Sequence, residues 1–348
     1  MTELILIFGV INLTPKQTFL FAMQTPLRIE LPAQFAHETV NVYAFTEPEL
    51  TLIDSGEANQ ASWEALQQGL VKAGLSVNEV RKIIITHAHV DHIGMAAQIA
   101  EASGAEIWVS DLVYDWAAFT AEKWQSRVDF LQVVFQKAQV PEVWYKPVIA
   151  YLQEIPAKWL PIPEKYLRRF SLQDTLSFAG NQWQVMHAPG HSASQTCFFQ
   201  PDTQQFFSAD MLLPITPVAV IEQEDQVPQK RVPGLVQMVE SFEKITQMPI
   251  AVSYPGHGEP FADHQGLIAK QVARIHQRKN QCLEVVRAGV EQAFDIARKL
   301  YADASPTMLF SGFAMTLGYL DLLAAEGLVV QHDTPQGWRF EAVAQKQV

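Results

Sequence analysis

The feature that most constrains this 348-residue chain is a cluster of three histidines and one aspartate within residues 87–92. The cluster directly follows the apolar, β-branched run 83–85 and precedes a helical pattern that begins at Ile93. The end of a strand beside the start of a helix is where an α/β sheet usually places its site. Imidazole nitrogens and carboxylates are ligands that suit zinc, iron and manganese. The spacing H-x-H-x-D-H therefore indicates a metal site rather than a polar turn with incidental histidines.

Four further segments place a polar side chain just past a strand-like run, beside small residues that allow a tight turn. These side chains are Asp54, His191, Asp210 and His257. Together with the first cluster they account for five of the ten histidines. They are the partners that the first cluster needs to complete a metal site.

This ordered set of motifs resembles the metallo-β-lactamase superfamily, in particular its large hydrolase branch with the H-x-H-x-D-H signature. The resemblance covers about residues 24–265 and implies a four-layer αββα sandwich with two metals in a shallow groove at the sheet edges. It implies three groups of ligands: His87, His89 and His191 for the first metal, Asp91, His92 and His257 for the second, and Asp210 with a hydroxide as the bridges. Two cations about 3.5–4 Å apart lower the pKa of a bound water and polarise a substrate carbonyl or phosphoryl oxygen.

The resemblance also assigns roles within the site. Asp54 is expected outside the ligand set, where it accepts an N–H bond from a ligand histidine and fixes its tautomer. Asp91 is expected to move a proton to the leaving group in addition to binding metal, and Asp210 to bridge the metals. Zinc is the expected metal, with iron or manganese as alternatives. His187 is expected to be a strand residue or an outer partner, and the remaining histidines are expected at the surface: His37, His264, His276 and His332.

The chain is expected to divide into an N-terminal extension, residues 1–22, a catalytic domain, residues 23–265, and a C-terminal domain, residues 266–348. In the catalytic domain the residue pattern alternates between strands and helices, which implies a layered α/β architecture. Strands are expected at 27–31, 40–45, 50–53, 81–86, 106–109 and repeatedly between 174 and 207, with helices at 58–73 and 92–102.

Residues 111–170 interrupt this alternation and hold half of the eight tryptophans. Their aromatic residues recur near a helical period, so we expect a helical insertion that buries its own aromatic face. A lid over the metals that lines an apolar substrate pocket is compatible with that role. The candidate pocket residues are Trp116, Phe119, Trp124, Trp144 and Tyr151.

The C-terminal part resembles a winged-helix tail of the kind found on some members of the superfamily, including relatives of a mitochondrial endoribonuclease. It is expected to contain one amphipathic helix over 266–302, a helix over 307–325 and two strands near 327–330 and 338–340. The second helix contains no Lys or Arg, although cationic contacts to phosphate supply most nonspecific affinity for nucleic acid. We therefore expect no nucleic-acid partner and expect this helix to pack against protein, either the insertion or a second copy in a homodimer.

Composition limits the partners and the location. The net charge of −12 argues against a polyanionic partner, and no apolar run reaches the roughly 18 residues that span a bilayer. The first residues lack the features of a signal peptide, and two cysteines, Cys197 and Cys282, make no disulfide framework. We therefore expect a cytoplasmic protein with no membrane partner.

Differences between this sequence and other branches of the superfamily narrow the range of possible substrates. The site has no cysteine ligand and the tail is not the basic helical one that holds glutathione, so antibiotics and glutathione thioesters are disfavoured. The sequence predicts a binuclear metal-dependent hydrolase of a small ester, thioester or lactone with an apolar portion. The alternatives are a phosphodiesterase or nuclease of the same fold, or a metal-bound regulatory relative without turnover. A mononuclear iron oxygenase is disfavoured by the complete second ligand set.

Overall fold

The computed structural model describes residues 24–34, 38–159, 161–215, 217–224, 227 and 230–344. The predicted N-terminal extension and His37 lie outside the described residues.

The first sheet contains six strands in the order β1-β2-β3-β4-β5-β6. The strands are β1 (Leu27–Pro32), β2 (Thr39–Phe45), β3 (Leu50–Ile53), β4 (Val80–Ile84), β5 (Glu106–Ser110) and β6 (Leu167–Phe170). β1, β2 and β3 pair antiparallel, and β3 to β6 pair parallel. Parallel neighbours need long crossover connections, which here contain helices. These helices and the short 3₁₀ turns are α1 (Gln60–Lys72), η1 (Val77–Glu79), α2 (Val90–Ile93), α3 (Ala96–Ser103) and η2 (Glu164–Tyr166), together with the insertion described below.

The second sheet contains five strands in the order β11-β10-β9-β8-β7. The strands are β7 (Thr175–Phe178), β8 (Asn181–His187), β9 (Thr196–Gln200), β10 (Gln205–Ala209) and β11 (Val252–Pro255). All pairs are antiparallel except β10 with β11, which are parallel and are joined through α7 (Gly234–Thr246).

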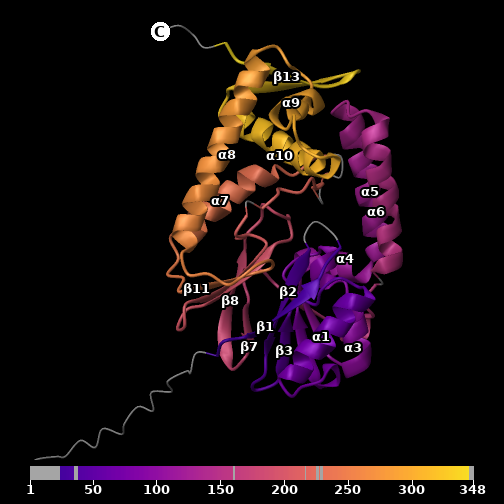
Figure 1. The fold of residues 1–348 in the computed structure, drawn as a ribbon, viewed down its shortest axis with the longest axis vertical. Helices are drawn as coiled ribbons and strands as arrows, with labels where there is room; N and C mark the ends of the chain where they lie inside the picture. Colours follow the sequence, from indigo (N-terminus) through magenta and orange to yellow (C-terminus); the bar gives the residue numbers. More distant parts are fainter. Residues whose placement is uncertain are drawn as a thin grey trace, which may run out of the picture.

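Alternation along the strands divides the core into layers. In β2, Tyr43 and Phe45 belong to an aromatic cluster with residues of the second sheet, whereas Val42 and Ala44 join the larger cluster that includes the helices. Successive strand side chains point to opposite faces, so one face of β2 meets the other sheet and the other face meets helices. The fold is the predicted αββα sandwich (Figure 1).

The predicted segments around the histidine cluster differ in detail from the observed ones. The strand expected over 81–86 ends at Ile84, because the chain then leaves the sheet and bends into the site. The single helix expected over 92–102 is two helices, α2 and α3. At the break, a Cβ on Gly94 would lie 2.7 Å from the backbone nitrogen of Ala58, so the close approach of two loops requires glycine here.

The insertion is helical, as predicted, and consists of α4 (Asp111–Ala118), α5 (Thr120–Lys137) and α6 (Glu142–Lys158). α5 and α6 form a hairpin that extends from the sandwich to the C-terminal helices (Figure 1). The insertion has its own aromatic core, in which Trp124 lies 5.7 Å from Trp116 and 6.0 Å from Trp159 between ring centroids.

The C-terminal part contains α8 (His264–Arg287), α9 (Ala293–Leu300), α10 (Pro306–Ala325) and a hairpin of β12 (Val329–Thr334) and β13 (Gly337–Ala342). The single helix predicted over 266–302 is wrong, because the chain breaks between α8 and α9, where Gly289 adopts a φ of 87°. The helix over 307–325 and the hairpin lie where the sequence predicts them. The winged-helix designation and the domain boundary at 265 remain predictions.

α10 packs within its own chain. The ring of Phe135 from α5 contacts Phe310 and Phe313, so the predicted packing of this helix against the insertion is confirmed. Among the described residues, the stretch Met308–Ala325 is long and apolar enough to cross a membrane, which differs from the sequence expectation. However, 61% of that stretch is buried inside the protein, and its Asp321 pairs with Arg231. A buried core helix has the same composition.

Candidate metal centre

Seven imidazole and carboxylate side chains converge at the ends of strands from both sheets. His87 and His89 lie in the loop after β4, and Asp91 and His92 lie in α2. The others follow three strands of the second sheet: His191 after β8, Asp210 after β10 and His257 after β11. Six of the seven side chains are buried, and His89 is partly exposed.

The first group consists of three ring nitrogens. Nδ1 of His89 lies 3.0 Å from Nε2 of His87 and 2.9 Å from Nε2 of His191. All three nitrogens lie within 4.8 Å of one another. Three nitrogen donors converging at this separation can hold one divalent cation and leave a fourth position open.

The second group consists of Asp91, His92 and His257, whose donor atoms also lie within 4.8 Å of one another. Nε2 of His257 lies 3.4 Å from Oδ2 of Asp91, and Nε2 of His92 lies 3.9 Å from Oδ1 of Asp91.

Asp210 lies between the two groups. Its Oδ2 is 3.4 Å from Nε2 of His191 in the first group and 3.3 Å from Nε2 of His257 in the second. Its Oδ1 is 3.4 Å from Nε2 of His92. This is the position that the sequence predicts for a bridging carboxylate.

Nε2 of His92 and Oδ1 of Asp210 are buried and, although 3.4 Å apart, have no hydrogen-bond partner of acceptable geometry among the described residues. Leaving such atoms unsatisfied costs about 1–3 kcal/mol each, so they are kept where a ligand satisfies them. The mixed nitrogen and oxygen donor set suits zinc, iron or manganese. The residues therefore fit divalent cations.

Four of the histidines use their second ring nitrogen to hold the first one toward the centre. The Nδ1 partners are Oγ1 of Thr86 for His87 (3.0 Å), Oδ2 of Asp54 for His92 (2.8 Å), the carbonyl of Val218 for His191 (2.9 Å) and the carbonyl of Thr39 for His257 (2.5 Å). Such outer partners fix the tautomer and the orientation of the ring. The structure places Asp54 where the sequence predicts it, but Thr86 and the two carbonyls carry no sequence signal that identifies them.

The backbone around the centre adopts unusual conformations. Asp54 has a φ of 62°, in the left-handed region that costs energy for a residue other than glycine. A Cβ on Gly256 would lie 2.1 Å from Oδ1 of Asp210 and 2.8 Å from Cε1 of His92. Only glycine therefore fits beside these two side chains.

The surroundings of the centre shift the pKa values of several donor side chains and so set their protonation states. Burial lowers the pKa of His87 and of His89 well below the usual range, which keeps both rings neutral. Burial alone would raise the pKa of Asp91, but His92 and His257 outweigh it and lower that pKa to about 2. Burial would lower the pKa of His257, but Asp210 and Asp91 raise it to about 10. A cation binding at His257 therefore displaces a proton.

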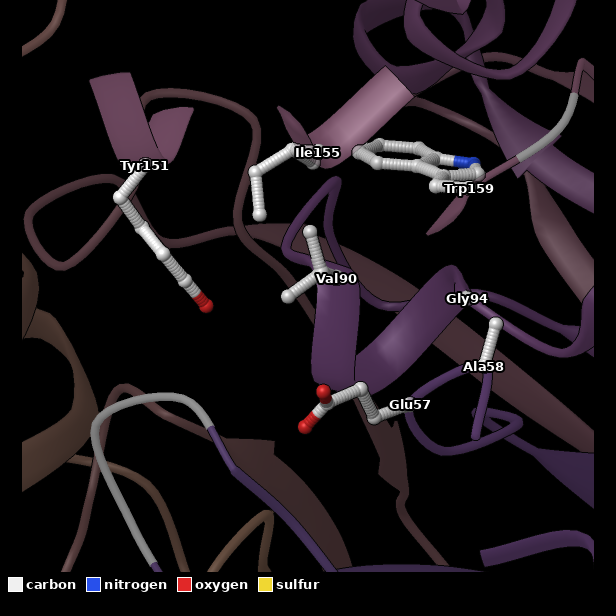
Figure 2. Close-up of a pocket in the computed structure, with 7 residues that line it drawn as sticks. All are labelled: Glu57, Ala58, Val90, Gly94, Tyr151, Ile155 and Trp159. Carbon is white, nitrogen blue, oxygen red and sulfur yellow. The ribbon is translucent and has the colours of Figure 1, made fainter. Parts of the chain in front are cut away.

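A small pocket lies beside α2, the helix that carries Asp91 and His92. It is lined by Glu57, Ala58, Val90, Gly94, Tyr151, Ile155 and Trp159. Figure 2 shows the hydroxyl of Tyr151 and the carboxylate of Glu57 pointing toward the same space, between α6 of the insertion and the loop that begins α1. The insertion therefore supplies one wall of a pocket beside α2.

Of the five candidate pocket residues, the structure places Tyr151 in this pocket. Trp116 and Trp124 pack around Trp159 in the core of the insertion. Phe119 is 53% exposed, and Trp144 contacts the ring of Phe294 in the C-terminal part.

The other histidines that the structure describes lie outside the centre. His187 ends β8 and hydrogen-bonds the carbonyl of Ala193 at 2.8 Å, so its assignment as a strand residue is confirmed. His276 and His332 are exposed, as predicted. His264 is buried at the start of α8, so its surface assignment is wrong.

Comparisons with known proteins agree with this geometry. Residues 37–257 match the profile of the Metallo-beta-lactamase superfamily. The chain is 24% identical over 307 residues to a probable metallo-hydrolase, YqjP, of Bacillus subtilis, a match that covers 88% of this chain and 94% of that protein. It is 23% identical over 253 residues to an atrochrysone carboxyl ACP thioesterase of Aspergillus fumigatus, which covers 72% of this chain and 61% of that protein.

Among solved structures, the chain is similar to a metallo-beta-lactamase family protein from Thermus thermophilus. The TM-score is 0.75 at 22% identity, and the match covers 91% of this chain and 98% of that one. The shared fold therefore extends beyond the residues that match the superfamily profile.

Proposed function

Because the chain belongs to the metallo-β-lactamase superfamily and is a hydrolase of it, we propose that it is a binuclear metal-dependent enzyme that cleaves a small ester, thioester or lactone with an apolar portion. The observation that carries this proposal is the convergence of two three-donor groups, with Asp210 between them.

Each of the two donor groups would bind one cation. His87, His89 and His191 would hold one cation and Asp91, His92 and His257 the other, with zinc proposed first and iron or manganese as alternatives. When bound, two such cations lower the pKa of a water and polarise a substrate carbonyl oxygen. Asp210 keeps the two groups at a fixed separation.

Asp91 is the proposed proton carrier. Its carboxylate lies among the donors of the second group, where it would accept a proton from the attacking water and return it to the leaving group. The carboxylate is buried and held by His257, which fixes its direction.

The apolar portion of the substrate would lie against the apolar side chains that line the pocket beside α2 rather than inside it, since its volume of about 10 Å³ holds about one water. Val90, Ile155 and Trp159 supply apolar surface, while the Tyr151 hydroxyl and the Glu57 carboxylate supply polar groups that orient a bound molecule (Figure 2). A thioester is the first choice within this class, because one relative is named as an acyl-carrier-protein thioesterase.

The alternatives lack a supporting observation of their own. α10 has no Lys or Arg and is mostly buried, so it offers little to a phosphate backbone. A metal-bound regulatory relative without turnover would keep the same ligands, and a lack of hydrolysis of every substrate in the series below would favour it. Both cysteines are unpaired and buried, which supports the proposed cytoplasmic location.

A series of acyl thioesters and lactones of increasing chain length, with a phosphodiester for comparison, tests this proposal. Each buried methylene contributes about 0.8 kcal/mol, so kcat/KM should rise about fourfold per added carbon until the acyl chain covers the apolar wall. Ile155→Ala should move the optimum to a longer chain, whereas Val143→Ala, on the exposed face of the same helix, should not. A flat response to chain length, or a preference for the phosphodiester, would contradict the proposal.

A further inference from the structure

Glu222 is a carboxylate beside the first donor group that no sequence motif identifies. Its side chain is only 13% exposed. It accepts hydrogen bonds from Oγ of Ser192 at 3.1 Å and from the backbone N–H of Ala193 at 2.5 Å. Both donors directly follow His191, so Glu222 is fixed to the loop that carries one of the three histidines.

The other side of Glu222 faces His89. His89 differs from the other four histidines of the centre because it turns Nδ1, rather than Nε2, toward its neighbours. Its Nε2 therefore needs the outer partner that the others have at Nδ1. The group nearest to that atom among the described ion pairs is Oε1 of Glu222, at 4.0 Å. This is too long for a direct hydrogen bond, so the carboxylate acts on the ring as a nearby charge.

A negative charge at that position favours the tautomer that carries its proton on Nε2. The lone pair of Nδ1 is then available to a cation held with His87 and His191.

Arg127, on α5 of the insertion, forms an ion pair with Glu222. Its Nη1 lies 3.5 Å from Oε1 of Glu222, and its guanidinium lies 5.8 Å from the ring centroid of Trp124. A buried carboxylate without a partner cation is strongly destabilising. A second contact joins the same segments, since Nε2 of Gln223 donates to Oγ of Ser126 at 2.9 Å. The insertion is therefore attached to the segment that supports the first donor group.

We propose that Glu222 is a positioning residue for His89 and that Arg127 holds Glu222 in place, so that the insertion supports the first metal group as well as the substrate pocket. This inference rests on the proposed metal site.

Zinc affinity of the full-length chain tests it. Each variant is titrated with zinc against a chromophoric chelator, and cobalt substitution reports the coordination spectroscopically. Glu222→Gln should bind one of the two equivalents about 10–100-fold more weakly, the usual effect of losing an outer partner of a histidine ligand. Glu224→Gln is the matched control, because Glu224 lies two residues away and pairs with Lys230 at 2.7 Å rather than with the centre.

Arg127→Met should weaken the same equivalent, and Arg127→Lys, which keeps the charge, should restore part of the affinity. These two variants also provide the test if Glu222→Gln does not fold, which thermal unfolding detects. Parental affinity for both equivalents in Glu222→Gln, or an equal loss in Glu224→Gln, would overturn the positioning role. Parental affinity in Arg127→Met would overturn the role of the insertion. If the parent binds none of zinc, iron and manganese, the proposed function fails and this inference fails with it.

Discussion

Replacing Asp54 with asparagine tests how far the centre depends on its outer partners. Oδ2 of Asp54 accepts from Oγ1 of Thr86 at 2.9 Å and from Nδ1 of His92 at 2.8 Å, while Oδ1 accepts from the backbone N–H of Thr86 at 2.9 Å. Asparagine has one oxygen, so its amide N–H₂ must face one of these sides. If the amide N–H₂ faces the backbone N–H of Thr86, that buried N–H loses its acceptor, which costs about 1–3 kcal/mol of stability.

Facing His92 instead, the amide would donate to Nδ1 and force the ring proton onto Nε2. That is the atom 3.4 Å from Asp210 in the centre, so the ring could no longer bind a cation there. We expect Asp54→Asn to lower the affinity for one metal equivalent about 10–100-fold, equivalent to about 1.4–2.8 kcal/mol.

Competition with a chelator measures the affinity, and urea denaturation measures the stability. Asp174→Asn is the matched control, because the Asp174 carboxylate accepts from the backbone of Ser171 in an exposed turn. If Asp54→Asn bound both equivalents as tightly as the parent and was equally stable, the outer-partner argument would be refuted.

The same geometry supports three further predictions. Asp210→Ala should reduce kcat/KM more than Asp54→Ala, because Asp210 lies between both donor groups. Steady-state kinetics of the two metal-loaded variants measure this, and equal values of kcat/KM would contradict it. The C-terminal part should not bind RNA or duplex DNA in an anisotropy titration at low salt, the most permissive condition, and salt-sensitive micromolar binding would revive the nuclease alternative. Burial raises the pKa of Cys282 to about 12, so at pH 8 only about one molecule in ten thousand carries the thiolate; iodoacetamide should leave the folded protein unmodified and label it after unfolding.

Much of the centre could be predicted because its side chains sit at one repeated position, just past a strand. The motif around His87 and the isolated acids and histidines downstream each follow a strand-like run, and strand ends gather at one edge of the sandwich. The structure brings together all seven predicted donors. The carbonyl partners at Thr39 and Val218 could not be predicted, because every residue has a carbonyl and only the tertiary fold selects one.

In the insertion, the periodicity of the sequence predicts the helices but not the contacts of their side chains. Its aromatic spacing predicted helices but not which face each ring occupies, because α5 contacts both α6 and the C-terminal part. Trp144 therefore lies against Phe294 rather than in the pocket, whereas Ile155 lines the pocket without any distinguishing pattern. Arg127 has the appearance of an ordinary charged residue on a helix surface, and its partner Glu222 is distant in sequence.

The metal content of the purified protein tests the central claim most directly. Protein prepared without chelator and supplemented with zinc, iron or manganese should contain close to two metal ions per chain by elemental analysis, because two three-donor groups share Asp210. A content that stays near one per chain after supplementation would contradict the binuclear centre and favour the mononuclear alternative.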